Sequence, residues 1–190
     1  MKNLKFSLWG QMLLMAKTHL TTGFLFMILF LFTMSMEGPA YNVIFGTCGL
    51  LGYFLTIYQN ASSAYFDDKK TVSPLTPKAL KGFILPLLLS AISLVIIILY
   101  KFAWAYGAVS KDALALWAVP IQAIANLWTV PYHTFIGMEQ GGLSLVGYII
   151  IFVTPFIASG LGYFAAYKGF DLNAKIHGLA YEKKTDKTEF

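Results

Sequence analysis

Long apolar stretches separated by short polar segments dominate this sequence. Five of these stretches carry few or no charged residues, and their lengths are close to the about 20 residues that a helix needs to cross a bilayer. Backbone polar groups in lipid must be hydrogen-bonded within the protein, which restricts spanning segments to helices and closed barrels. The pattern therefore predicts an all-α, polytopic helical membrane bundle, with residues 1–190 in a single membrane domain.

The first third of the chain predicts a surface helix followed by a helical hairpin. Residues 1–19 place three lysines around a short apolar run that includes Trp9, which is typical of a helix lying in the membrane interface. The segment 20–58 is then expected to form two spans that reverse at Gly38 and Pro39. Small residues recur in the second of these spans and would let a neighbouring helix approach closely; they are Gly46, Gly49 and Gly52.

The polar segment 59–81 is expected to form a cytoplasmic loop, because Pro74 and Pro77 oppose a regular helix there. Its acidic pair, Asp67 and Asp68, is followed by two lysines, so we interpret the pair as solvated. The remaining spans are assigned to 82–167 and the cytoplasmic tail to 168–190. Small residues at helical spacing in the last span are further candidates for close packing; they are Ala158, Gly162 and Ala166.

The uncharged segment 113–138 decides the number of spans. If it crosses the membrane, five full spans divide the lysines as seven against seven. If it is broken or re-entrant, the division is twelve against two, which agrees with the excess of lysine on the cytoplasmic side of membrane proteins. Pro120 and Pro131 also suit a broken segment. We therefore predict four spans plus a broken or re-entrant segment, with five full spans as the alternative.

This segment also carries a polar face. At 100° per residue, four polar residues fall on one side of a helix, while an aromatic and apolar face with Trp117 and Trp128 lies opposite. The four residues are Gln122, Asn126, Thr129 and His133. This polar face could line a cavity with His133 as its titratable member, lie at the interface toward water, or hydrogen-bond a neighbouring helix.

The other candidates for chemistry are weaker. We expect His19 and His177 to be solvated at span ends and Cys48 to be a small buried packing residue. The chain has no HExxH, GxSxG, Walker or CxxC motif and no set of residues spaced to bind a metal, so we expect no catalytic site, metal or cofactor. All 14 basic residues are lysines, and the absence of arginine, the residue best suited to bidentate phosphate binding, disfavours a partnership with nucleic acid.

Several short motifs resemble a group of uncharacterised small polytopic membrane proteins of low-GC Gram-positive bacteria. The motifs are Gly52-Tyr53 through Tyr58 into Asp67-Asp68-Lys69-Lys70, then Lys81-Gly82-Phe83, Gly162-Tyr163 and Tyr167-Lys168-Gly169-Phe170. The resemblance implies a bacterial cytoplasmic membrane with both termini in the cytoplasm, and it implies no specific activity.

Together these observations favour a non-catalytic accessory or assembly subunit of a membrane complex. Its expected partners are the lipid bilayer and either a second copy of the chain or another membrane protein. The alternative is a small-solute or ion transporter that uses the polar face of 113–138.

Overall fold

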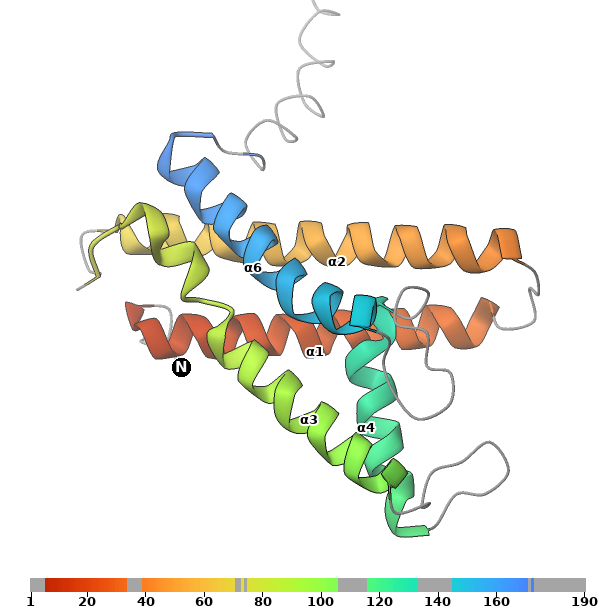
Figure 1. The fold of residues 1–190 in the computed structure, drawn as a ribbon. Coiled ribbons are helices and arrows are strands. Elements are labelled where there is room, and N and C mark those ends of the chain that lie inside the picture. The colour runs from red at the N-terminus through yellow and green to blue at the C-terminus, as the bar shows by residue number, and fades with distance from the viewer. Residues whose placement is uncertain are drawn as a thin grey trace, which may run out of the picture.

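The computed structural model is all-α over the residues that it describes, which are 6–33, 39–70, 73, 75–105, 116–132, 145–170 and 172. Its α-helices are α1 (Leu8–Thr33), α2 (Pro39–Asp68), α3 (Leu87–Ala105), α4 (Val119–Thr129) and α6 (Leu145–Tyr167). Three short 3₁₀ helices accompany them (Figure 1): η2 (Ala79–Phe83), η3 (Leu116–Ala118) and η4 (Val130–Tyr132). The predicted all-α class is confirmed.

Three helical segments of the described chain are long and apolar enough to cross a membrane: Leu8–Thr33, Ala79–Ala105 and Val146–Tyr167. They carry large apolar side chains on their outer surfaces, as a protein surrounded by lipid tails requires. These features are those of a membrane protein.

Helices α1 and α2 form a long antiparallel hairpin (Figure 1). Helix α1 is continuous from Leu8, so the expected separation of an interfacial helix at 1–19 from a span beginning at Leu20 is not found in residues 8–33. The hydroxyls of Thr18 and Thr21 bond to carbonyls of the same helix, so these polar residues do not interrupt it. Helix α2 likewise runs on to Asp68, which makes 59–68 helical rather than part of a loop.

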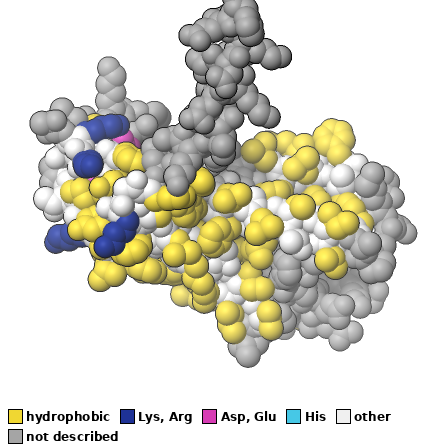
Figure 2. Space-filling model, turned by 90° about the horizontal axis from the view of Figure 1, so that it is seen from above, with side chains coloured by type: hydrophobic (Ala, Val, Ile, Leu, Met, Phe, Trp, Pro, Cys, Tyr) yellow, Lys and Arg dark blue, Asp and Glu magenta, His cyan; other side chains and the backbone are white. Residues whose placement is uncertain are grey.

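The ends of four elements meet at one end of the molecule. The start of α1, the end of α2, η2 and the end of α6 are joined there by side-chain hydrogen bonds. Lysines gather at this end (Figure 2), and we call it the basic end. Its described lysines are Lys69, Lys70, Lys78, Lys81 and Lys168.

Small residues let α6 lie directly against α2. A Cβ atom added at Gly162 would overlap the backbone of Tyr58, while Ala158 and Ala166 are fully buried at 0% and 1% exposure. Small residues let helix backbones approach, which increases dispersion contact in lipid. In this chain, Gly162 therefore lies at a contact between two of its own helices, and Ala158 and Ala166 are buried on the same helix.

The glycines of α2 also pack against other parts of the chain. Gly46 and Gly49 are buried, and a Cβ atom on Gly52 would lie 3.1 Å from the ring of Phe26. Gly23 of α1 is a further close contact, since its added Cβ would lie 2.7 Å from the carbonyl oxygen of Leu127 on α4. Cys48 is exposed on α2, so the expectation that it is buried is wrong.

Helix α4 is the described core of the segment 113–138. It contains 11 residues, which gives a length of about 16 Å, and it packs against α1 and α3. Pro120 lies in its first turn and Pro131 in η4 directly after it, where the missing N–H of proline costs little. Residues 133–138 and most of the predicted tail lie outside the described residues.

The contact between α6 and α2 makes Gly162 sensitive to a single added methyl group. Gly162→Ala is expected to lower the free energy of unfolding by about 1–3 kcal/mol, because the helices must separate to admit the methyl. Thermal unfolding of the purified protein in detergent measures the effect. Leu161→Ala, at a residue that is 51% exposed, is the matched control and should unfold close to the wild type; an equal loss in both variants would contradict close packing at Gly162.

Candidate functional site

The basic end encloses a cluster of four polar side chains, which we call the Asp68 cluster: Gln11, Asp68, Lys81 and Tyr163. The carboxylate of Asp68 accepts a hydrogen bond from Gln11 Nε2 at 2.8 Å and one from the Tyr163 hydroxyl at 2.6 Å. Lys81 Nζ donates to both carboxylate oxygens, at 2.8 and 2.6 Å. The Asp68 side chain is 0% exposed and that of Lys81 8% exposed, so the ion pair is buried. Its hydrogen bonds join α2 to α1, η2 and α6.

Local sequence explains why these groups meet. Asp68 is the last residue of α2, where the partial negative charge of the helix end disfavours a carboxylate, so an adjacent cation is needed. Gly82 lets η2 lie directly on α6, because its added Cβ would be 2.7 Å from the Ser159 carbonyl oxygen. Ser159 Oγ donates a 2.6 Å hydrogen bond to the Gly82 carbonyl. These contacts hold η2 so that Lys81 reaches the carboxylate.

The structure corrects the interpretation of Asp67 and Asp68 as one solvated pair. Asp67 forms an ion pair with Lys70, whose side chain is 55% exposed, whereas Asp68 is buried. The distinguishing signal lies in the sequence: if the helical period of α2 is continued past Tyr58, Asp68 falls on the same face as Ile57 and Ala64, which are buried. The adjacent Asp67 falls on a different face. Continuing that helix to its end would have identified Asp68 as a core residue.

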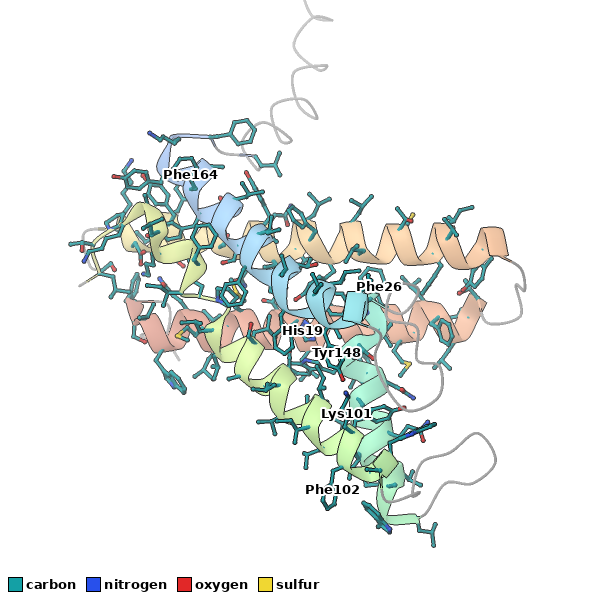
Figure 3. The ribbon with its side chains drawn as sticks, in the orientation of Figure 1. His19, Phe26, Lys101, Phe102, Tyr148 and Phe164 are labelled. Carbon is teal, nitrogen blue, oxygen red and sulfur yellow. The ribbon has the colours of Figure 1, made fainter. Side chains whose placement is uncertain are left out.

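A second buried cluster lies deeper in the bundle, around His19. Its ring Nδ1 lies 3.0 Å from the Tyr53 hydroxyl and its Nε2 lies 3.0 Å from the Trp128 carbonyl oxygen. Trp128 Nε1 donates to Ser93 Oγ at 2.8 Å, and Ser93 donates to the Leu89 carbonyl at 2.9 Å. This His19 cluster joins α1, α2, α3 and α4 at the centre of the molecule (Figure 3).

The hydrogen bonds define the protonation of the imidazole. A carbonyl oxygen can only accept a hydrogen bond, so Nε2 of His19 carries the proton and donates a hydrogen bond to the carbonyl oxygen of Trp128. In the neutral ring, Nδ1 then accepts from the hydroxyl of Tyr53. His19 is 1% exposed, so the expectation of a solvated imidazole at a span end is wrong. The other such candidate, His177, lies outside the described residues.

The predicted polar face of 113–138 is described at three of its four positions. Gln122 and Asn126 are half-buried, while Thr129 is buried and donates to the Ala125 carbonyl of its own helix at 2.8 Å. His133 lies outside the described residues. On the opposite face, Trp117 is 52% exposed but Trp128 is only 7% exposed, because its indole belongs to the His19 cluster. The surface of this helical segment therefore does not divide into one polar side and one lipid-facing side.

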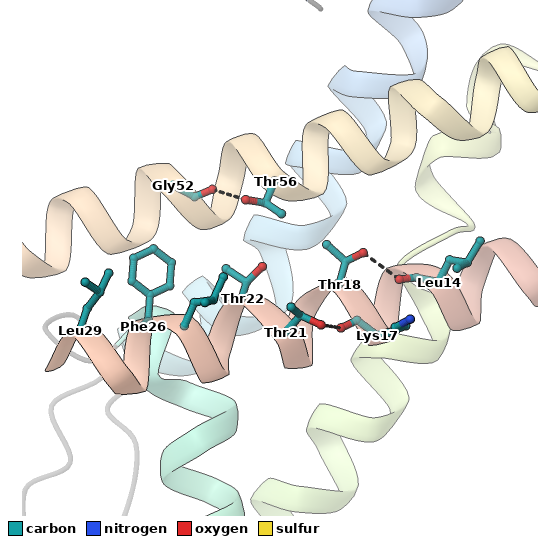
Figure 4. Close-up of a pocket in the computed structure, with 10 residues that line it drawn as sticks. Leu14, Lys17, Thr18, Thr21, Thr22, Phe26, Leu29, Gly52 and Thr56 are labelled. Atoms are coloured by element: carbon teal, nitrogen blue, oxygen red, sulfur yellow. Dashed lines mark hydrogen bonds between the residues drawn. The ribbon is translucent and has the colours of Figure 1, made fainter. Parts of the chain in front are cut away.

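An open groove follows the seam between α1 and α2 (Figure 4). Its larger hollow, of about 530 Å³, is lined by Leu14, Lys17, Thr18, Thr21, Thr22, Leu25, Phe26, Leu29, Gly52 and Thr56. A smaller hollow, of about 200 Å³, is lined by Gln11, Leu14, Asn60, Ser63, Ala64 and Asp67. Leu14 lines both hollows, so they adjoin along one seam, and we call them together the seam groove.

The two buried clusters use their polar groups to join helices. Within the described residues, no group of three or more histidine, cysteine, aspartate or glutamate side chains is arranged to hold a metal ion. Comparison of the chain with protein-family models, curated proteins and solved structures finds no match. The seam groove is an open hollow of the described surface with room for a ligand.

The Asp68 cluster predicts a large difference between two adjacent aspartates. Asp68→Asn is expected to lower the free energy of unfolding by about 3–5 kcal/mol, because it leaves the buried Lys81 without its counter-charge. Asp67→Asn, which affects only a partly exposed pair, should cost less than about 1 kcal/mol. Thermal unfolding of both variants in the same detergent measures the difference.

A double variant tests whether the charge itself matters. Asp68→Asn combined with Lys81→Met removes both charges and is expected to unfold at a higher temperature than Asp68→Asn alone. Equal stability of Asp67→Asn and Asp68→Asn would contradict the buried ion pair.

Proposed function

We propose that the chain crosses the membrane four times, through α1, α2, the segment from η2 through α3, and α6, and that 113–138 is a broken segment between the last two spans. Support comes from the meeting of four element ends at Asp68, since an even number of crossings returns a chain to its starting side. The length of α2, about 45 Å for its 30 residues, exceeds the about 30 Å of the hydrocarbon core. The about 16 Å of α4 is shorter than that core.

The basic end faces the cytoplasm in this proposal, and both termini are cytoplasmic. Lysines mark the cytoplasmic side of membrane proteins. Among the lysines that the structure describes, Lys101 lies near the end of α3 that is away from the basic end, with its Nζ 4.8 Å from the centroid of the Tyr148 ring. The membrane concerned is the bacterial cytoplasmic membrane, as the resemblance in the sequence implies.

We further propose that the protein is a non-catalytic accessory or assembly subunit of a membrane complex. The observation that carries this proposal is the half of the hairpin away from the basic end, which extends beyond the other helices (Figure 1). Its outer surface on α2 combines large apolar residues with small ones. Val43, Ile44 and Leu51 are 59%, 63% and 58% exposed, and Thr47 and Cys48 are exposed between them.

This α2 outer face has the composition that helices use to associate in lipid. Packing and close approach drive such association, because the lipid tails are as apolar as leucine side chains. The small side chains of Thr47 and Cys48 would allow a partner helix to come near, and Ile44 and Leu51 would pack on either side of it. A second copy of the chain or another membrane protein could supply that helix.

The transporter alternative requires the polar face of α4 to line a path. Thr129 instead bonds within its own helix, and the seam groove is lined by α1 and α2. These observations favour the accessory role over transport.

Cysteine labelling tests the proposed topology on a Cys48→Ser background. Ser73→Cys and Phe170→Cys are expected to be protected from a membrane-impermeant maleimide in intact cells and labelled after permeabilisation. Leu116→Cys, at a 90% exposed residue close to Ala118, which packs with Ala103 near the end of α3, should be labelled in intact cells. Labelling of Ser73→Cys and Phe170→Cys from opposite sides would contradict four spans.

Cross-linking in membranes tests the α2 outer face. A photoreactive phenylalanine at Thr47 is expected to give a discrete adduct, whose mass assigns it to a second copy or to another protein. The same probe at Val95, a 56% exposed position on α3, is the control and should give at most diffuse labelling. Oxidation of the wild type would add a Cys48-dependent dimer if two copies pack symmetrically through this face. No discrete adduct from Thr47, or the same adducts from both positions, would contradict the proposed association.

A further inference from the structure

We propose that the seam groove binds an anionic glycerophospholipid from the leaflet at the basic end. One acyl chain would occupy the larger hollow, the phosphate would lie at Lys17, and the headgroup would reach the smaller hollow. The inference rests on the proposed membrane topology, which the cysteine labelling tests independently of any lipid.

The groove changes in polarity along its length, as an amphiphile would require. Toward the basic end, the smaller hollow offers the side chains of Asn60, Ser63 and Asp67. The larger hollow carries threonines in its middle part, and farther from the basic end it is lined by Leu25, Phe26 and Leu29. The polar part therefore lies where lipid headgroups lie in the proposed orientation, and the apolar part lies in the hydrocarbon core.

Lys17 marks the boundary between these two parts. It is exposed, and the next residue, Thr18, accepts a 2.7 Å hydrogen bond from Asn60 Nδ2 across the seam. Between Lys17 and the end of α1 the chain carries no aspartate, glutamate, lysine or arginine, and the one histidine, His19, is buried. A lysine at this level extends its ammonium group toward the headgroups while its methylenes remain in the apolar layer.

The length of the groove matches one leaflet. Twelve residues separate Lys17 from Leu29 on α1, which corresponds to about 18 Å of helix. Half of the hydrocarbon core is about 15 Å thick. An acyl chain whose headgroup lies at Lys17 would therefore extend along the whole larger hollow.

The charges around the groove favour a phosphate. No ion pair is described for Lys17, whereas the nearby Asp67 is paired with Lys70, so the carboxylate is already partly neutralised. Lys17 is then the cation available at the boundary, and anionic headgroups are attracted to lysines at this depth. The amide of Asn60 and the hydroxyl of Ser63 can hydrogen-bond the hydroxyls of a glycerol headgroup.

Lipid titration of the purified full-length protein, followed by native mass spectrometry, tests the proposal. The probes are dioleoylphosphatidylglycerol and dioleoylphosphatidylcholine, which share their acyl chains and differ in headgroup. The wild type is expected to bind one phosphatidylglycerol with an affinity about fivefold higher than for phosphatidylcholine, the factor expected from one lysine near an anionic headgroup. Equal affinity for the two lipids would overturn the proposal.

Two variants with matched controls locate the lipid. Lys17→Gln should abolish the preference for phosphatidylglycerol, while Lys168→Gln, at an exposed lysine of the same end outside the groove, should keep it. Thr21→Phe, which fills the larger hollow from an exposed position, should weaken binding of both lipids, and Val95→Phe on α3 should not. Thermal unfolding of each variant verifies that the fold is retained.

Two outcomes of these experiments would contradict the assignment. Equal effects of Lys17→Gln and Lys168→Gln would show general attraction of anionic lipid to the basic end. If Thr21→Phe leaves lipid binding unchanged but removes the adduct formed from Thr47, the seam would belong to a partner chain instead. Neither outcome depends on the cysteine-labelling result, so failure of the lipid site and failure of the topology can be told apart.

Discussion

The carboxylate of Asp68 is the constraint on which the rest of the structure depends. It is buried at the end of a helix whose dipole opposes its charge, so it is tolerable only with a cation and additional donors around it. Lys81, Gln11 and Tyr163 supply them from three other elements. Each donor fixes the end of one element relative to α2, and because one carboxylate serves all of them, displacement of any element leaves a buried polar group unsatisfied. Such networks define one arrangement of helices more strictly than apolar packing does.

The two polar clusters and the small-residue contacts act at different depths. The Asp68 cluster holds the helix ends, and the His19 cluster holds the middle, where α1 passes α2, α3 and α4. Between these levels, Gly162 brings α6 against α2. Beyond His19 along α1, Gly23 brings α4 against α1. In lipid, where apolar burial gives little net force between helices, hydrogen bonds and close backbone approach must supply the specificity. The use of Gly162 inside the chain also explains a small-residue pattern that would otherwise indicate an oligomer interface.

Much of the helical plan could be predicted from the sequence, because it depends on local hydrophobicity. The sequence predicts the remaining spans within 82–167, and helices α3 and α6 (Leu145–Tyr167) lie there. The predicted hairpin and the proline-bounded segment after α3 also correspond to observed helices. What local patterns could not supply is the environment of single polar residues. His19 was assigned to solvent because it stands near a charged span end, yet its partners Tyr53 and Trp128 are 34 and 109 residues away along the chain. Asp68 was obscured by its neighbour Asp67 and by the prolines that follow, which suggested a loop from residue 59 onward.

The order of the cluster along the chain has a consequence for biosynthesis. Gln11, Asp68, Lys81 and Tyr163 come from the first helix, the second helix, the start of the third and the end of the last. During synthesis from the amino terminus, the carboxylate and the ammonium can meet as soon as η2 leaves the ribosome, but the phenol arrives only after nearly all of the helices have entered the membrane. The carboxylate oxygen Oδ2, which also accepts from Lys81, therefore lacks its second hydrogen bond until α6 is in place. Closure of this final hydrogen bond marks the completion of insertion, and a chain truncated before Tyr163 would present an incompletely satisfied acid to the machinery that inspects membrane proteins.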